Sequence, residues 1–230
     1  MQLTELSPAL LTGQDAGPMQ LVEHNQQLHQ AVIPAYRQMQ QAAAQQGIAI
    51  RLVSGWRSFE RQAAIWQAKC EGRRPVFDRW QRLLKIEHYQ GLAKLEAIML
   101  YSALPGASRH HWGSDLDIYD AAAVSNDYQV QLQQSEYSAG GPFYRLSQWL
   151  TQHAAQYGFF LPYREFQGGV AAEPWHLSYQ PLAARCQQAL TLEQLRLVLQ
   201  QHPIAEQQTV LAHLPELYRR FICNICEALT

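Results

Sequence analysis

The sequence predicts an α+β fold, in which helices flank a small antiparallel sheet and further helices follow at the C-terminal end. Segments with helical spacing and short segments that alternate like strands follow one another without regular β-α alternation, which argues against a parallel sheet. The chain has 230 residues, of which 47% are hydrophobic, enough for one sizeable core. Beyond Pro181 the pattern is entirely helical.

The N-terminal third is predicted to contain a helix, a strand and a second helix. Residues 20–46 have helical character; Pro34 is tolerable in a first turn, and Gly47 is placed to end the helix. Residues 48–53 alternate like a strand. The second helix is indicated by a stripe of apolar residues at helical spacing, namely Phe59, Ala63, Trp66 and Cys70.

The middle of the chain has a less regular pattern. Residues 76–101 are predicted to form one or two helices, interrupted near Gly91. Residues 116–119 have strand character. Residues 121–141 are polar and rich in turn formers, which predicts a surface excursion.

An amphipathic helix over residues 143–157 is predicted to end at Gly158, and residues 159–161 are a candidate strand. Gly168 and Gly169 indicate a hairpin turn.

The helical pattern after residue 180 has expected breaks at Pro203 and Pro215. We therefore expect a main domain with N-terminal helices over residues 1–180. A helical extension, residues 181–230, is expected to pack on the same domain.

Charge excludes two classes of partner. The chain has 18 Lys and Arg against 19 Asp and Glu, a net charge of -1, without a polybasic run. Nucleic acid and anionic membranes are therefore not expected as partners. Residues 1–8 show no basic stretch followed by an apolar one, and no apolar run is long enough to span a bilayer, so we expect a cytoplasmic protein.

Four cysteines fit a reducing compartment. Cys70 and Cys186 have the character of buried small apolar residues. Cys223 and Cys226 form a C-x-x-C pattern, which can indicate a metal or redox site. Because no second such pair exists and the surrounding segment has helical character, we interpret both as packing residues.

Two short segments carry the chemistry: residues 108–117 (SRHHWGSDLD) and residues 173–176 (EPWH). His110 lies in a turn ahead of a strand that carries Asp117, and His176 would lie on a neighbouring strand. Two imidazoles and one carboxylate can hold Zn²⁺ and leave one open position for water. The two segments therefore predict a catalytic zinc site.

Glu173 stands three residues before His176, and Pro174 restricts it to an extended conformation that helps to direct its side chain. A carboxylate there suits a general base that takes a proton from water and passes it to a leaving amine. Trp175, between the two, is interpreted as a packing residue.

Alternative ligands exist within the same segments. His111 could replace His110, and Asp115 could replace Asp117, because residues two apart on a strand share one face. With nine histidines in the chain, chance neighbours of this kind are common. The joint occurrence with Gly113 and Trp175 favours a real site.

The pattern S-x-H-x-x-G-x-x-x-D followed by E-x-W-H resembles the VanY-type zinc carboxypeptidases. These belong to a wider group that contains bacterial D-Ala-D-Ala peptidases and the zinc-binding hedgehog domain. Further similar segments appear in the same order over residues 48–179: residues 54–58 (SGWRS) with Gln62, residues 105–108 (PGAS), and residues 157–159 (YGF).

The resemblance implies zinc ligands His110, Asp117 and His176, with Glu173 as catalytic base. It further implies that Arg57 stabilises the substrate's carbonyl oxygen or carboxylate, and that Gln62 and Ser108 contact the peptide. A fixed guanidinium opposite a developing oxyanion agrees with this role for Arg57.

The sequence also departs from the family pattern. Asp115 occupies a position where a small residue is usual, and Ser178 one where arginine is common after the W-H pair. The stretch between Gln62 and Pro105 is longer than typical, and the tail after Pro181 has no clear counterpart. Asp115 is accordingly interpreted as a carboxylate that supports the ligands.

The expected function is a zinc metallo-carboxypeptidase that releases a D-amino acid, usually D-alanine, from peptidoglycan stem peptides or muropeptides. A cytosolic D,D-carboxypeptidase would trim the pentapeptide precursors of the wall. We therefore favour an L,D-carboxypeptidase that converts tetrapeptides to tripeptides in murein recycling. A D,D-carboxypeptidase and a D-Ala-D-Ala dipeptidase are the enzymatic alternatives. A zinc-containing, non-catalytic peptide- or glycan-binding module is the alternative of another class, but such a module would not need Glu173.

Overall fold

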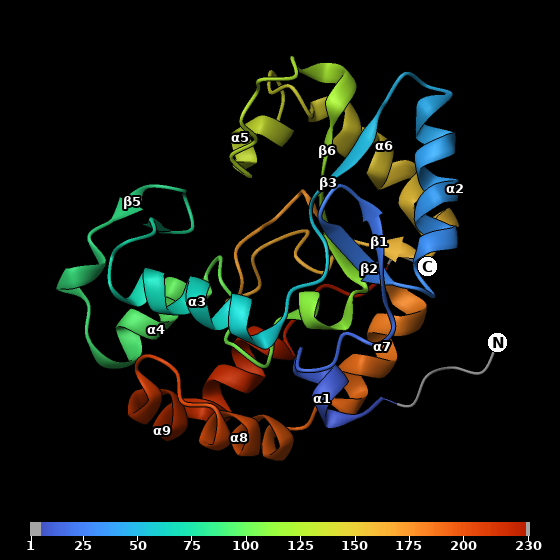
Figure 1. Cartoon of the computed structure of the whole chain (residues 1–230). Helices are drawn as coiled ribbons and strands as arrows, with labels where there is room; N and C mark the ends of the chain where they lie inside the picture. The colour runs from blue at the N-terminus through green and yellow to red at the C-terminus, as the bar shows by residue number, and fades with distance from the viewer. Residues whose placement is uncertain (1–5, 229–230) are drawn as a thin grey trace.

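The computed structural model describes residues 6–228, so residues 1–5 of the segment considered for a secretory signal lie outside it. At its centre is a four-stranded antiparallel sheet (Figure 1). Its strands, in spatial order, are β3 (Ile50–Ser54), β6 (Asp115–Asp120), β8 (His176–Tyr179) and β7 (Phe159–Phe160). This sheet with flanking helices confirms the predicted α+β class.

Two small hairpins accompany the sheet. One pairs β1 (Met19–Glu23) with β2 (Gln26–His29), and the other pairs β4 (Val76–Phe77) with β5 (Leu83–Leu84). The α-helices are α1 (Pro8–Leu11), α2 (Ile33–Ala44), α3 (Phe59–Cys70), α4 (Gly91–Met99), α5 (Gln134–Tyr137), α6 (Tyr144–His153), α7 (Gln180–Ala189), α8 (Leu192–Gln201) and α9 (Gln207–Leu217). Short 3-10 turns are η1 (Ile86–His88), η2 (Arg109–Trp112), η3 (Ala121–Ala123) and η4 (Ala154–Tyr157), and η5 (Tyr218–Ile222) is π-helical.

The helix predicted over residues 20–46 begins only at Ile33, so its first part was wrong. Residues 19–29 instead form the β1–β2 hairpin, with His24 at φ 42° in its turn. The backbone N–H of His29 donates to the carbonyl of Gly113 at 3.0 Å, which ties the hairpin to the segment after η2. This tertiary contact outweighs a local helical tendency.

The segment 76–101 also differs from the prediction. Its first part is the β4–β5 hairpin, whose turn is held by Asp78: the carboxylate accepts the backbone N–H groups of Trp80 and Arg82, each at 2.9 Å. Gly91 begins α4 instead of interrupting a helix.

The excursion 121–141 is largely polar, but Glu136 and Tyr137 are buried, and the Tyr137 hydroxyl donates to the carbonyl of Ile118 at 2.6 Å. Gly168, which has φ 90°, lies in the irregular segment that connects the antiparallel neighbours β7 and β8, so the predicted turn is part of a long connection instead of a tight hairpin. The carbonyl of Gly168 accepts a hydrogen bond from Arg220 Nε at 2.6 Å. The helix ended by Gly158 is confirmed: α6 and η4 precede this residue, which adopts φ 78°.

The C-terminal helices pack on the rest of the chain. α8 and α9 lie below α3 and α4 (Figure 1), where Trp66 Nε1 donates to the carbonyl of Ala205 at 2.9 Å and Lys94 pairs with Glu206 at 2.7 Å. The break at Pro203 occurs as predicted. The domain boundary at residue 180 stays a prediction.

Pro215, in contrast, lies inside α9, which continues into the π-helical η5. Residues 223–228 are not helical, so the C-x-x-C pair is not on a terminal helix as expected. Cys223 is exposed and Cys226 is buried; these two thiols and those of Cys70 and Cys186 are free.

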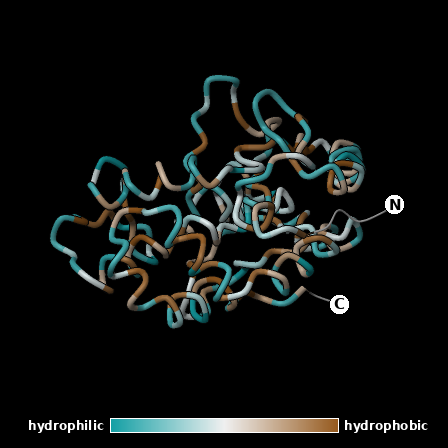
Figure 2. Tube along the Cα trace, turned by 60° about the horizontal axis from the view of Figure 1, so that its bottom comes forward, coloured by the Kyte–Doolittle hydropathy of each residue, from teal (hydrophilic) through white to brown (hydrophobic). Residues whose placement is uncertain are grey.

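Figure 2 shows hydrophobic and hydrophilic residues alternating along the chain, as expected where each element buries one face. The hydrophobic core draws on all parts of the fold; its largest fully buried side chains include Tyr36, Trp66, Trp112, Phe143 and Phe159. None of the helices formed by residues 6–228 has the length and apolar character needed to cross a bilayer.

Candidate metal centre and active-site cavity

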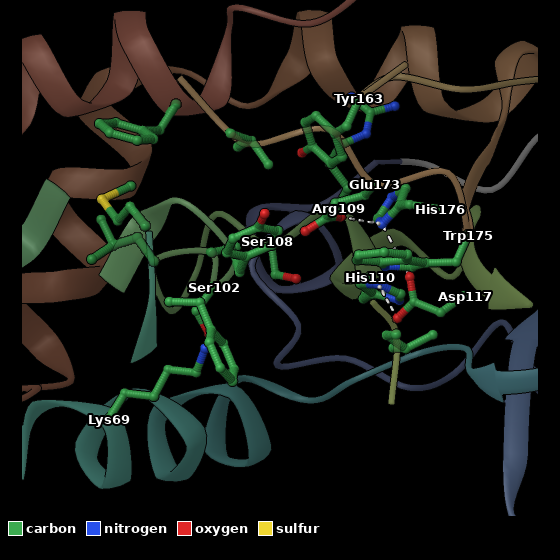
Figure 3. A pocket seen from close by; sticks show the side chains of 18 of the residues that line it. Lys69, Ser102, Ser108, Arg109, His110, Asp117, Tyr163, Glu173, Trp175 and His176 are labelled. Carbon is green, nitrogen blue, oxygen red and sulfur yellow. Dashed lines mark ion pairs between the residues drawn. The ribbon is translucent and has the colours of Figure 1, made fainter. Parts of the chain in front are cut away.

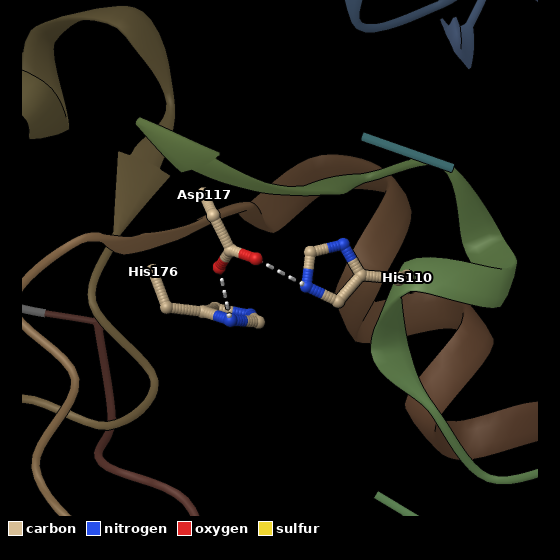
Figure 4. Close-up of side chains that lie close together, drawn as sticks. All are labelled: His110, Asp117 and His176. Carbon is tan, nitrogen blue, oxygen red and sulfur yellow. Dashed lines mark ion pairs between the residues drawn. The ribbon is translucent and has the colours of Figure 1, made fainter. Parts of the chain in front are cut away.

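Three side chains from separate elements converge at the sheet (Figure 4). His110 lies on η2, Asp117 lies on β6, and His176 is the first residue of β8, where it pairs directly with Asp117. η2 ends at Gly113, which has φ 63°, and a Cβ there would lie 2.7 Å from the backbone nitrogen of His29. Only glycine fits this bend, which directs the ligand-bearing turn into β6.

The three ligand atoms lie within 4.8 Å of one another, and two of the distances between them match those around a tetrahedral metal ion. His110 Nε2 lies 3.3 Å from Asp117 Oδ2, and His176 Nδ1 lies 3.2 Å from Asp117 Oδ1. Zinc bonds to nitrogen and oxygen ligands place adjacent ligand atoms about 3.3 Å apart in a tetrahedron. Two imidazoles and one carboxylate are also the ligand types that zinc prefers, so the residues present fit Zn²⁺.

Hydrogen bonds fix which nitrogen of each histidine faces the metal position. His110 Nδ1 lies 2.8 Å from the carbonyl oxygen of Gly55, and because a carbonyl only accepts, Nδ1 carries the proton and Nε2 is free to bind metal. His176 Nε2 lies 3.0 Å from Asp115 Oδ1, which leaves Nδ1 for the metal. A Cβ on Gly55 would lie 2.3 Å from the carbonyl oxygen of Gln27, so this position also requires glycine.

The alternative ligand His111 is occupied elsewhere. Its Nδ1 lies 2.7 Å from the carbonyl oxygen of Arg57, and its Nε2 accepts the backbone N–H of Gly106 at 3.1 Å. Burial lowers the pKa of His111 to about 3, so the ring is neutral. Both ring nitrogens bond the backbone and hold the loop ahead of η2 against the segment before α3.

Asp115, the other alternative, belongs to a buried ion-pair network. It accepts hydrogen bonds from Arg109 Nε at 2.7 Å, Ser114 Oγ at 2.6 Å and Ser178 Oγ at 3.1 Å, besides that from His176. Burial opposes ionisation of this carboxyl, but the Arg109 charge and these hydrogen bonds outweigh burial and hold its pKa below the usual range. Asp115 is therefore placed to orient His176.

Arg109 extends this network to the C-terminal helices. Its NH2 donates to Ser178 Oγ at 2.7 Å, and its NH1 donates to Gln187 Oε1 on α7 at 2.8 Å. The guanidinium also lies over the Trp112 ring at 4.8 Å. The two departures from the family pattern, Asp115 and Ser178, thus meet at one arginine.

Glu173 lies beside the metal position. Its Oε2 is 3.4 Å from His176 Nδ1, and the side chain is nearly buried. The backbone N–H of Glu173 donates to the carbonyl of Tyr163 at 2.8 Å, which anchors the start of the E-P-W-H segment. The carbonyl of Glu173 accepts the N–H of His176 at 3.1 Å, which closes the segment as a turn. Burial raises the pKa of Glu173, which brings its proton affinity closer to that needed for proton transfer near neutral pH.

Arg57 follows β3 and points to the same place. Its NH2 lies 3.4 Å from Asp117 Oδ2, its NH1 donates to Gln62 Oε1 at 2.9 Å, and its Nε donates to Ser54 Oγ at 3.2 Å. Gln62 is fully buried on α3, outside the cavity lining, and its Nε2 donates to the carbonyl of Ala103 at 2.7 Å. Gln62 thus holds the guanidinium.

The three metal ligands, Glu173 and Arg57 line a cavity of about 370 Å³ (Figure 3). Ser108 lies on its wall, and Trp175, nearly buried against the Tyr137 ring at 5.6 Å, also forms part of the lining. Trp175 therefore packs as predicted and in addition faces the cavity.

Several lining residues were not identified from the sequence, and three of them stand out. Tyr163 packs edge-on against the His176 ring at 4.9 Å, and Arg109 and Lys69 supply cations to the wall. The sequence around Tyr163 and Lys69 has no recognisable pattern. Arg109 stands next to His110, but its partner Asp115 is identified only once η2 and β6 are placed together.

Comparisons with known proteins place this geometry in a family. The family model described as VanY: D-alanyl-D-alanine carboxypeptidase matches residues 25–182. An uncharacterised protein of Haemophilus influenzae is 34% identical over 121 residues, which are 52% of this chain and 92% of the relative. The putative carboxypeptidase YodJ of Bacillus subtilis is 28% identical over 148 residues, 63% of this chain and 43% of YodJ.

Solved structures share the fold. VanYB in complex with D-alanine-D-alanine has a TM-score of 0.52 at 23% identity and covers 80% of this chain and 88% of its own. A mutant of the vancomycin-resistance D,D-pentapeptidase VanY, in complex with Zn(II), has a TM-score of 0.51 at 22% identity, over 77% and 88% of the two chains.

The family match spans most of the chain and contains both ligand segments, and the three ligands meet in one cavity with Glu173. The match ends at residue 182, so α8 and α9 lie beyond it. The protein belongs to the VanY family of D-alanyl-D-alanine carboxypeptidases and is a zinc metallo-carboxypeptidase.

Proposed function

We propose that this enzyme is an L,D-carboxypeptidase that removes the terminal D-alanine of tetrapeptide stems in muropeptides and leaves tripeptides. The observation that carries the proposal is the extent of the cavity, which continues from the metal ligands to Lys69 and Arg74. In a D,D substrate the residue before the scissile bond is alanine, with one methyl group. In an L,D substrate it is a long diamino acid, which this cavity can accommodate.

The proposed place of the reaction is the cytoplasm, in murein recycling. Free thiols at all four cysteines support a reducing compartment. An L,D activity is compatible with that compartment because it spares the pentapeptide precursors of wall synthesis, which a D,D activity would trim.

In this mechanism, His110, Asp117 and His176 hold the metal. When bound, Zn²⁺ supplies a Lewis acid that polarises the scissile carbonyl and lowers the pKa of water at its open position. Asp115 and the Gly55 carbonyl keep the two imidazoles in the orientation that directs their free nitrogens to the metal.

Glu173 moves the proton. Its carboxylate takes a proton from the attacking water and delivers it to the amine of the departing D-alanine, for which its raised pKa is suited. Arg57 places a positive charge where the carbonyl oxygen becomes negative, or binds the substrate's carboxylate. We propose that Gln62 contributes by orienting Arg57, and that Ser108, on the cavity wall, contacts the peptide.

The test is to incubate the purified enzyme separately with muropeptide tetrapeptides and pentapeptides. Release of D-alanine from the tetrapeptide supports the proposal. Release of D-alanine only from the pentapeptide would overturn the L,D assignment, and release of the dipeptide D-Ala-D-Ala would identify a dipeptidase.

A further inference from the structure

The cavity has a cationic end away from the metal ligands. The segment over residues 69–85 has six cationic side chains but only two acidic ones, Glu71 and Asp78. Glu71 pairs with Arg73, and Asp78 pairs with Arg82. The remaining cations of this segment are Lys69, Arg74, Arg79 and Lys85.

Of these, Lys69 and Arg74 line the cavity. Within residues 6–228, neither has a carboxylate partner at ion-pair distance. Lys69 extends from α3 toward the cavity (Figure 3). Lys69 is half-buried, and this burial lowers its pKa to about 8, against the opposing charge of Glu173. A partly buried cation that lines a cavity without a carboxylate partner makes this end of the cavity suited to an anion.

The spacing along α3 gives the separation between the backbone of Lys69 and that of Gln62, which holds Arg57. Gln62 contacts Arg57, and Lys69 follows Gln62 by seven residues on the same helix face. Two helical turns correspond to about 10 Å along the axis, or about three residues of extended peptide.

A carboxypeptidase releases a single residue, so the leaving side of the substrate is too short to reach this far. The anion must therefore belong to the part of the peptide that precedes the scissile bond.

We propose that Lys69 and Arg74 form a subsite for a carboxylate on the acyl side of the scissile bond, so that the enzyme selects acidic stem peptides. This inference rests on the proposed L,D-carboxypeptidase function. Two carboxylates of a stem tetrapeptide could bind there: the side-chain carboxylate of meso-diaminopimelate, beside the scissile bond, and the α-carboxylate of the D-glutamate before it.

Three synthetic tetrapeptides distinguish these sources. The first contains both carboxylates, the second has L-lysine in place of meso-diaminopimelate, and the third has D-isoglutamine in place of D-glutamate. The rate of D-alanine release from each peptide is measured with the wild-type zinc enzyme and with the Lys69→Met, Arg74→Met and Lys85→Met variants. Lys85 is the matched control, because it is an exposed cation of the same segment outside the cavity lining.

On the peptide with both carboxylates, Lys69→Met is expected to lower kcat/KM about tenfold to a hundredfold, mainly through KM, because a charged hydrogen bond is lost. Arg74→Met is expected to lower kcat/KM less, because Arg74 is exposed. Lys85→Met is expected to leave kcat/KM unchanged. The effect of Lys69→Met should disappear on the peptide that lacks the bound carboxylate, which identifies the carboxylate.

An equal loss on all three peptides, or no loss on any, would overturn the subsite. A wild-type enzyme that releases no D-alanine from any of them contradicts the proposed function instead. In that case the subsite can still be tested by calorimetry with the corresponding tripeptides, which lack the terminal D-alanine. Equal affinity of the wild type and Lys69→Met for the acidic tripeptide would overturn the subsite. Thermal unfolding of Lys69→Met serves as the folding control, with a melting temperature at or above the wild-type value expected.

Discussion

Replacing Asp115 with asparagine tests a residue that supports the metal centre without being one of its ligands. Asp115 and Arg109 are buried to 0% and 3% side-chain exposure, and their contact is 2.7 Å. Breaking a buried ion pair at one partner costs about 3–5 kcal/mol, because the other charge stays buried and uncompensated. The metal-free variant should therefore unfold at a lower urea concentration than the metal-free wild type, and its free energy of unfolding should be lower by about 3–5 kcal/mol.

Zinc affinity should fall in the same variant for a different reason. His176 Nε2 would donate to a neutral amide instead of a carboxylate, and loss of such an outer partner lowers metal affinity by about tenfold to a hundredfold. Competition with a chelating dye measures this directly.

The double variant Arg109→Met with Asp115→Asn is the matched control. It removes the uncompensated charge, so stability should recover in part while zinc affinity stays low. A zinc affinity within about twofold of wild type in Asp115→Asn would refute the role assigned to Asp115.

The remaining predictions concern catalysis and the fold. Glu173→Ala should keep its zinc, measured by metal analysis, and lose D-alanine release by about 10²–10⁴-fold; loss of the metal would show that Glu173 is needed for binding zinc. Arg57→Met should lower kcat about 10²–10³-fold, and an unchanged kcat would exclude charge stabilisation by Arg57. KM for the acidic tetrapeptide should rise above about pH 8, where burial makes Lys69 lose its proton in the free enzyme, and Lys69→Met should show no such rise; a rise of the same size in that variant would assign the titration to another group. Leu214→Ala, at a fully buried position of α9, should cost about 2–5 kcal/mol in urea unfolding; a cost near zero would mean that α9 contributes little to the core.

The metal ligands could be predicted because each lies in a short segment whose residue pattern indicates its local structure. A glycine-closed turn entering a strand brings His110 toward Asp117, and the strand character of residues 116–119 was legible from the sequence. That Asp117 pairs directly with His176 required the register of β6 and β8, which no local pattern gives.

The parts that could not be predicted depend on contacts distant in sequence. The β1–β2 hairpin is joined to Gly113 by the backbone of His29, and this contact overrides the helical tendency of a glutamine-rich segment. The resemblance already implied Asp117 and not Asp115 as the ligand, but the partners that occupy Asp115, namely Arg109 on η2 and Ser178 on β8, could not be predicted.

The length of the stretch between Gln62 and Pro105 was visible in the sequence, but its role was not. Only in the fold do Arg74 and Lys69 both line the cavity, where the backbone N–H of Arg74 donates to the carbonyl of Ala68 on α3 at 3.1 Å. Cations without a carboxylate partner can be recognised only when the surrounding carboxylates are located.

The central claim, a zinc carboxypeptidase centred on His110, Asp117 and His176, is tested most directly by D-alanine release from a muropeptide tetrapeptide before and after metal removal. Release should stop when a chelator removes the metal and return when stoichiometric Zn²⁺ is restored. Undiminished release by the metal-free protein would contradict the account.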